Sequence, residues 1–200
     1  MYLETNKFKR IISIIALIIL LFSCVDWEAS YDLQTRKGYV AREFGLESID
    51  HIPRKVEGRM FECNFTSQEV IHAFGSCGIQ FGQYLDSAKI KEAIDNTVGL
   101  KLKSTDKNSF FIYMDHDEIN NAVFSPNLYP IPYLNSHLKR KNKTVGCYEV
   151  ILIEYSNKNI MNPLENGDGF DYPGDWKDGY IKGIAYSYSE EFIYYFFHAW

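Results

Sequence analysis

The sequence predicts an α+β fold: a mainly antiparallel sheet with two short helices in a single compact domain. Segments with strand periodicity outnumber helical ones, and the two kinds do not alternate regularly along the chain, as they would in a parallel α/β fold. Of the 200 residues, 46% are hydrophobic and 24% are charged. This composition is typical of a chain that buries a core, and the length suits one domain.

Residues 61–96 contain one expected strand and two expected helices. Apolar and polar residues alternate over residues 61–65, which is the period of a strand. A helix over residues 66–75 begins with Thr66 and Glu69, which match a capping box. A second helix is expected over residues 87–96 because its apolar residues share one helical face. That face consists of Ile90, Ala93 and Ile94.

A β-hairpin is expected to follow the second helix. Residues 98–103 alternate between apolar and polar side chains, and a polar turn separates them from the apolar residues 110–114. Residues 125–143 contain three prolines and are expected to be irregular and extended.

The last third of the chain predicts three more strands. Residues 145–155 are almost continuously apolar, as in a central strand covered on both faces. Residues 180–188 and 192–200 form a second hairpin, and both faces of its last strand are apolar. We expect this strand to be buried on both sides, with His198 as a hydrogen-bonded core histidine. The alternative is an exposed aromatic surface for a partner.

The chain begins with a segment that has the properties of an export signal. Lys7, Lys9 and Arg10 precede a 12-residue apolar stretch over residues 11–22. A helix needs about 20 apolar residues to cross a bilayer, so this stretch is typical of the apolar region of a signal peptide. An uncleaved anchor and a buried core helix are the alternatives.

The sequence Leu21-Phe22-Ser23-Cys24 resembles the lipobox of bacterial lipoproteins. The resemblance implies a signal peptide over residues 1–23, cleavage before Cys24, and acyl chains such as palmitate on Cys24. The partner at this end is then the lipid bilayer, and two or more chains give stable anchoring. Val25 replaces the aspartate that retains enteric lipoproteins at the inner membrane, which favours the outer membrane, facing the periplasm or the cell surface.

The remaining chain is expected to consist of a lipidated tether or poorly patterned segment over residues 24–54, with a short helix marked by Val40 and Phe44, and an α+β domain over residues 55–200. Loss of residues 1–23 removes three of the 21 cations and one of the 26 acidic residues, which changes the net charge from −5 to −7. This charge excludes a nucleic-acid binder that works through a basic surface.

Three cysteines other than Cys24 would lie in an oxidising compartment. Any pair of Cys63, Cys77 and Cys147 leaves one thiol over. We favour a Cys63–Cys77 disulfide, whose loop of about 15 residues would contribute roughly 3 kcal/mol on the entropic description. Cys147 lies in an apolar strand pattern, so its side chain is expected to be buried. The absence of a C-x-x-C motif argues against zinc and thioredoxin-like sites.

Two polar clusters carry alternative hypotheses. Residues 115–118 (DHDE) have the side chains of a metal site or a general base, and also of a solvated turn. Residues 165–178 contain five acidic residues and three glycines, which suit calcium but lack EF-hand spacing, so a surface loop is expected. In the same loop, Tyr172 and Trp176 are candidates for contact with a partner or a sugar ring.

The sequence therefore predicts a membrane-anchored lipoprotein of the cell envelope that acts as a non-catalytic binding module. We expect it to neutralise or dock a protein partner, without a cofactor and without nucleic acid. One alternative is an envelope hydrolase that uses His116 with Asp115, Asp117 or the 165–178 loop, with or without a metal. Another is a glycan-binding lipoprotein that uses Tyr172 and Trp176.

Overall fold

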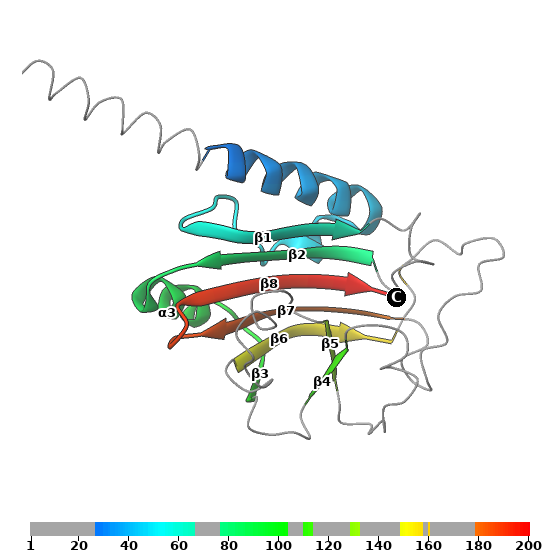
Figure 1. Cartoon of the computed structure of the whole chain (residues 1–200). Coiled ribbons are helices and arrows are strands. Elements are labelled where there is room, and N and C mark those ends of the chain that lie inside the picture. Colours follow the sequence, from blue (N-terminus) through cyan, green and yellow to red (C-terminus); the bar gives the residue numbers. More distant parts are fainter. Residues whose placement is uncertain are drawn as a thin grey trace, which may run out of the picture.

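The structure is a computed structural model, and it describes residues 27–66, 77–103, 110–113, 129–132, 149–157, 160 and 179–200. Its centre is a six-stranded antiparallel sheet with the strand order β1-β2-β8-β7-β6-β3 (Figure 1). The predicted α+β class is confirmed. In chain order, the strands of this sheet are β1 (Arg59–Thr66), β2 (Cys77–Tyr84), β3 (Leu100–Lys103), β6 (Glu149–Ser156), β7 (Tyr180–Ser187) and β8 (Phe192–Ala199).

Two cores enclose the sheet, one on each face. The strand period of two places alternate residues of β8 on opposite faces, and all eight residues of that strand are buried. The helix-side core contains residues of three elements outside the sheet, together with Ile193, Tyr195 and Phe197 of β8. The opposite core contains Phe192, Tyr194, Phe196 and Trp200, packed with Ile131 of β5 (Tyr129–Pro132). Burial of the last strand on both faces is confirmed.

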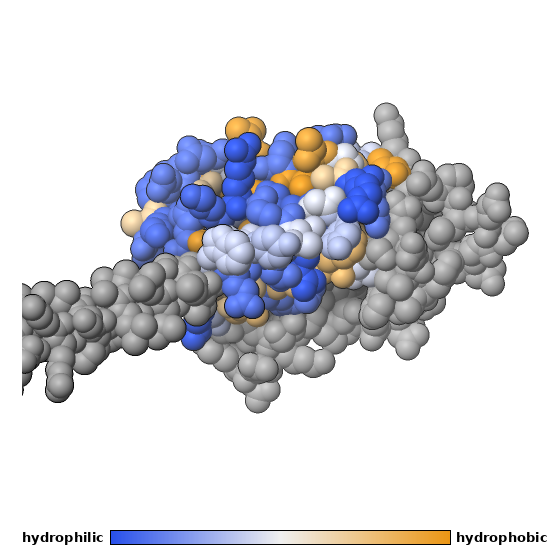
Figure 2. Space-filling model, turned by 90° about the horizontal axis from the view of Figure 1, so that it is seen from above, coloured by the Kyte–Doolittle hydropathy of each residue, from blue (hydrophilic) through white to orange (hydrophobic). Residues whose placement is uncertain are grey.

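A helix over residues 27–44 covers part of the helix-side core. Leu33 and Val40, seven residues apart and therefore on one helical face, are fully buried. This helix is longer than the short one expected around Val40 and Phe44, and it lies within the expected tether. Lys37 occupies the same face between Leu33 and Val40, which weakens the apolar pattern in the sequence. Figure 2, which views the molecule from above, shows that its outer surface is mostly hydrophilic, with a paler band along it.

The C-terminal hairpin agrees with its prediction. β7 and β8 pair from Tyr180↔Ala199 to Ser187↔Phe192 without a register shift. Glu191, with φ 52°, closes the connection, and its carbonyl accepts a hydrogen bond from Leu85 N at 2.9 Å. This contact fastens the turn to the start of α3 (Ser87–Asp95).

The helix predicted over residues 87–96 is confirmed as α3, with Ile90 and Ile94 buried. Asp86 caps its N-terminus by accepting a hydrogen bond from Lys89 N at 2.9 Å. A 3₁₀-helix, η1 (Leu46–Ile49), follows the N-terminal helix after Gly45. Most of the helix predicted over residues 66–75 lies outside the described residues, and Thr66 itself ends β1.

The hairpin predicted from residues 98–103 and 110–114 is wrong. β3 pairs antiparallel with β6, whereas β4 (Phe110–Tyr113) pairs parallel with β5 in a separate two-stranded sheet. Strand periodicity shows that a segment is extended, but it carries no information on which neighbour supplies the hydrogen bonds. β5 itself falls within the segment that its prolines predicted to be irregular.

The favoured Cys63–Cys77 disulfide is not formed, and both residues are thiols in the structure. Cys63 lies opposite Phe81 in the β1–β2 register, and Cys77 lies four residues before Phe81, at the start of β2. Four residues of a strand span roughly 13 Å, whereas the Cα atoms of a disulfide lie within about 7 Å. Cys24 and Cys147 lie outside the described part of the chain.

Candidate functional site

A pocket of about 390 Å³ lies between the N-terminal helix (residues 27–44) and the segment that follows it, residues 46–54. Both walls come from the part of the chain that the sequence predicts to be poorly patterned. The lining residues are Gln34, Lys37, Gly38 and Ala41 of the helix and Leu46, Ile49, Asp50, Ile52 and Arg54 of the segment.

Lys37 fastens the two walls of this pocket together. Its ammonium donates hydrogen bonds to the backbone carbonyls of Ile52 at 2.5 Å and Pro53 at 3.2 Å. Burial lowers the pKa of Lys37, the nearby Arg54 lowers it further, and Asp50 opposes this shift. Gln34 adds a second link, since its Nε2 donates to the Arg54 carbonyl at 2.6 Å. The hydrogen bonds of Lys37 are therefore made within the pocket wall.

A second buried lysine supports the segment from the sheet. Lys182 of β7 donates to the Glu47 carbonyl at 2.7 Å, and its ammonium lies 3.1 Å from Glu154 Oε2 and 3.4 Å from Asp50 Oδ1. The Tyr180 hydroxyl donates to Glu154 and, together with Lys182, lowers the pKa of that carboxyl. Lys182 thus anchors η1, which carries Glu47, over the helix-side core.

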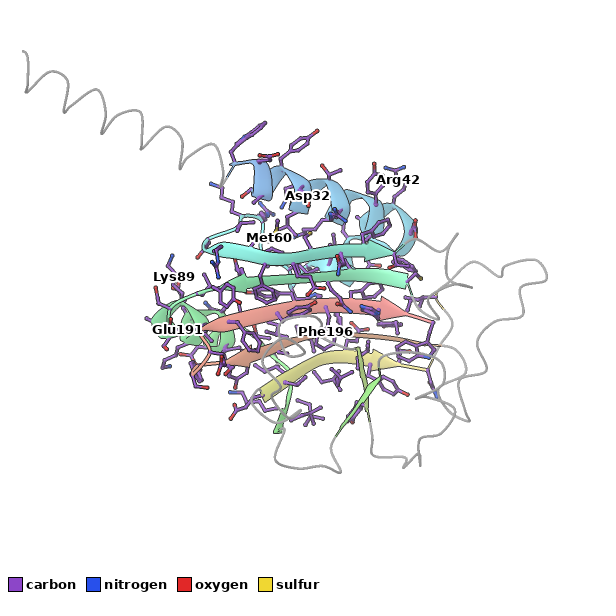
Figure 3. The ribbon with its side chains drawn as sticks, in the orientation of Figure 1. Asp32, Arg42, Met60, Lys89, Glu191 and Phe196 are labelled. Carbon is purple, nitrogen blue, oxygen red and sulfur yellow. The ribbon has the colours of Figure 1, made fainter. Side chains whose placement is uncertain are left out.

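His51 connects the same segment to the centre of the sheet. Its Nε2 lies 3.0 Å from the carbonyl of Phe196, which Figure 3 labels on β8. Its side chain is only 5% exposed, and burial lowers the pKa to about 4. The ring is therefore neutral at pH 7, so Nε2–H donates and Nδ1 carries the lone pair. Nδ1 has no hydrogen-bond partner among the described residues and lies 3.9 Å from Asp50 Oδ1.

His198 lies in the opposite core, where a chain of hydrogen bonds fixes it. The Tyr194 hydroxyl donates to Gln80 Oε1 at 2.8 Å, and Gln80 Nε2 lies 2.9 Å from His198 Nε2. An amide nitrogen only donates, so His198 Nε2 accepts and the imidazole is neutral. Burial lowers its pKa to about 3. The prediction of a hydrogen-bonded core histidine is confirmed.

Gly38 keeps one side of the pocket open. A Cβ atom built on it would meet nothing within 4 Å, although glycine in a helix interior costs roughly 0.5–1 kcal/mol relative to alanine.

Arg54 is exposed, and its guanidinium makes no ion pair within the described part of the chain. The pocket thus combines apolar lining from Leu46, Ile49 and Ile52 with an available cation. This arrangement suits binding of an apolar group that carries a nearby carboxylate.

The groups suited to covalent or acid–base chemistry have structural roles where they are described. Burial raises the pKa of Cys63 and of Cys77 to about 12, so neither is a thiolate at neutral pH. Across the described ranges, no three His, Cys, Asp or Glu side chains are grouped to hold a metal ion. None of the described helices is both long and apolar enough to span a bilayer.

Most site residues predicted from the sequence lie outside the described residues. These are Cys24, Tyr172 and Trp176, the cluster at residues 115–118 and the loop at residues 165–178. The pocket was missed. Two features of the sequence accompany it: a lysine on the apolar face of a helix, and a glycine directly after that lysine. By themselves both features indicate a weak helix and do not predict a pocket.

Comparison of the chain with models of known families, with curated proteins and with solved structures finds no match in any of the three.

Proposed function

We propose that this protein is a lipoprotein of the bacterial cell envelope, anchored in the outer membrane through Cys24, whose domain is a non-catalytic binding module for a protein partner. The leader with its lipobox-like sequence supports the anchor. The pocket between the N-terminal helix and residues 46–54 supports the binding role, and it is the observation that carries the proposal.

The lining of the pocket defines the group that it would accept. Leu46, Ile49 and Ile52 offer apolar surface, and Arg54 offers a guanidinium that recognises carboxylates. Lys37 adds a positive charge in the pocket wall, and its ammonium donates its hydrogen bonds to the carbonyls of Ile52 and Pro53. A partner segment with an apolar side chain next to an aspartate, a glutamate or a C-terminal carboxylate has the complementary chemistry.

Crosslinking in intact envelopes tests the binding role. Gly38→Leu fills the pocket from a position where the added Cβ meets no atom, and Arg54→Glu reverses the available charge. We expect both variants to reduce the yield of the crosslinked partner about tenfold or more, which corresponds to a loss of about 1.4 kcal/mol. Gly38→Ala and Lys55→Glu are the matched controls, because alanine is small and Lys55 is an exposed cation outside the pocket lining.

The binding proposal fails if the wild-type chain gives no saturable crosslinked partner. It also fails if Gly38→Leu and Arg54→Glu retain the partner as well as their controls do.

Fractionation tests the anchor separately. Cys24→Ser removes the thiol that accepts the lipid, so the variant should leave the membrane fraction while the wild type stays in it. Retention of Cys24→Ser in the membrane would mean that residues 1–23 act as an uncleaved anchor.

A further inference from the structure

The N-terminal helix carries an exposed pair of aromatic side chains at its start. Trp27 is 70% exposed and Tyr31 is 63% exposed, on the helical face opposite the buried Leu33 and Val40. Their rings stack with centroids 5.6 Å apart and an interplanar angle of 18°. Two large rings held together on the outer surface form an apolar patch that the described parts of the protein leave uncovered.

The chain restricts how far this patch can lie from the lipid site. Trp27 follows Cys24 by three residues, and an extended chain spans at most about 3.6 Å per residue. The Cα atoms of the two residues are therefore within about 11 Å of each other. The polar interfacial layer on each side of a bilayer is roughly 5–8 Å thick. A lipid on Cys24 thus holds Trp27 at or next to this layer.

The charge on the outer helix face also suits a membrane surface. Its exposed residues include one acid, Glu28, and one base, Arg42, whereas the chain from Cys24 onward has a net charge of −7. Asp32, on the flank, is paired with Arg36 at 3.0 Å. This face is therefore nearly neutral, and it meets less repulsion from anionic lipid than the acidic protein as a whole.

We propose that Trp27 and Tyr31 lie in the interfacial layer of the bilayer and hold the N-terminal helix, and with it the domain, in a fixed orientation on the membrane. This inference rests on the proposed lipid anchor at Cys24. Tryptophan and tyrosine are enriched at membrane interfaces because their rings are apolar at one end and hydrogen-bonding at the other. The acyl chains supply the attachment, and the aromatic pair supplies the orientation.

Fluorescence quenching tests the orientation. The full lipidated chain is placed in phosphatidylcholine vesicles with and without phosphatidylcholine brominated near the headgroup end of its acyl chains. The signal of Trp27 is the difference between the wild type and Trp27→Phe. We expect the brominated lipid to reduce this signal about twofold or more, and aqueous acrylamide to have little effect on it.

A tryptophan introduced far from the helix is the matched control. Val98, 90% exposed, precedes β3, which is separated from β1 by four strands or roughly 24 Å (Figure 1). In the Trp27→Phe background, the signal added by Val98→Trp should be insensitive to the brominated lipid and readily quenched by acrylamide.

The mass of the N-terminal peptide separates failure of this inference from failure of the anchor. An unmodified Cys24 in the same sample overturns the anchor, and the inference falls with it. A lipidated Cys24 with Trp27 insensitive to brominated lipid overturns the inference alone. A third outcome combines both samples: Trp27 is insensitive to brominated lipid in vesicles but is shielded from acrylamide in intact envelopes. In that case a protein covers the patch, and the inference is likewise wrong.

Discussion

The two buried histidines predict that the protein loses stability on mild acidification. Burial keeps both imidazoles neutral: His51 Nε2 lies 3.0 Å from the Phe196 carbonyl, and His198 Nε2 lies 2.9 Å from Gln80 Nε2 in the opposite core. Burial lowers their pKa values from 6.5 to about 4 and about 3. The folded state therefore binds fewer protons than the unfolded chain below pH 6.5, so the free energy of unfolding decreases as the pH falls.

The loss of stability at low pH can be worked out from the two pKa shifts. Each histidine contributes its full stabilisation above pH 6.5, and the loss is complete only near pH 4 for His51 and pH 3 for His198. At pH 5 an unfolded histidine is largely protonated while these two are still mostly neutral. Each loses about 2 kcal/mol by that pH, or about 4 kcal/mol together, against a typical total stability of 5–15 kcal/mol.

Urea unfolding of the purified chain in a mild detergent, followed by circular dichroism between pH 7.5 and 5.0, measures the change. His51→Gln and His198→Gln should each remove about half of the pH dependence, and the double variant should remove nearly all of it. His72, His116 and His137 lie outside the described residues, and the double variant separates their contribution. An unfolding free energy that is constant from pH 7.5 to 5.0, or a double variant with the wild-type slope, refutes the reasoning.

Three further substitutions test the packing, each by urea unfolding at pH 7.5. Gly38→Ala should raise the free energy of unfolding by about 0.5–1 kcal/mol, because alanine is more stable than glycine in a helix interior and the added Cβ meets no atom within 4 Å. The same change at Gly78 should lower it by about 2–3 kcal/mol, since φ is +142° there and a Cβ would lie 2.0 Å from the Phe197 carbonyl oxygen. Tyr194→Phe should lower it by about 1 kcal/mol by removing the hydrogen bond from the Tyr194 hydroxyl to the part-buried Gln80 Oε1. Equal effects at Gly38 and Gly78 would contradict the local geometry of both.

The helix α3 could be predicted from the sequence because its apolar residues, among them the buried Ile90 and Ile94, repeat at helical spacing. The C-terminal hairpin could be predicted because two largely apolar runs flank a short polar turn, and not because its burial is periodic. Which strands pair with each other could not be predicted. Residues 98–103 and 110–114 were expected to form one hairpin, but β3 and β4 belong to different sheets. Which strand lies next to which depends on long-range packing that no local pattern records.

The pocket could not be predicted because the residues that form it violate the local rules. Lys37 lies on the apolar face of its helix, where its ammonium is stabilised by the carbonyl groups of residues 52 and 53 and by the nearby Asp50. Gly38 is a poor helix former in a helix interior. Without the tertiary contacts, both residues indicate a weak helix, so the segment reads as a tether.

The position of β8 has a consequence for the order in which the protein assembles. β8 lies between β2 and β7, so it is the only strand that joins the β1–β2 pair to the β7-β6-β3 half of the described sheet. The two halves of the sheet cannot pair until residues 192–199 have been synthesised and have reached their place between β2 and β7. Pairing of β2 with β8 spans more than 100 residues, and such distant contacts form slowly. Until residues 192–199 are available, the edges of β2 and β7 that pair with β8 are therefore expected to stay unpaired.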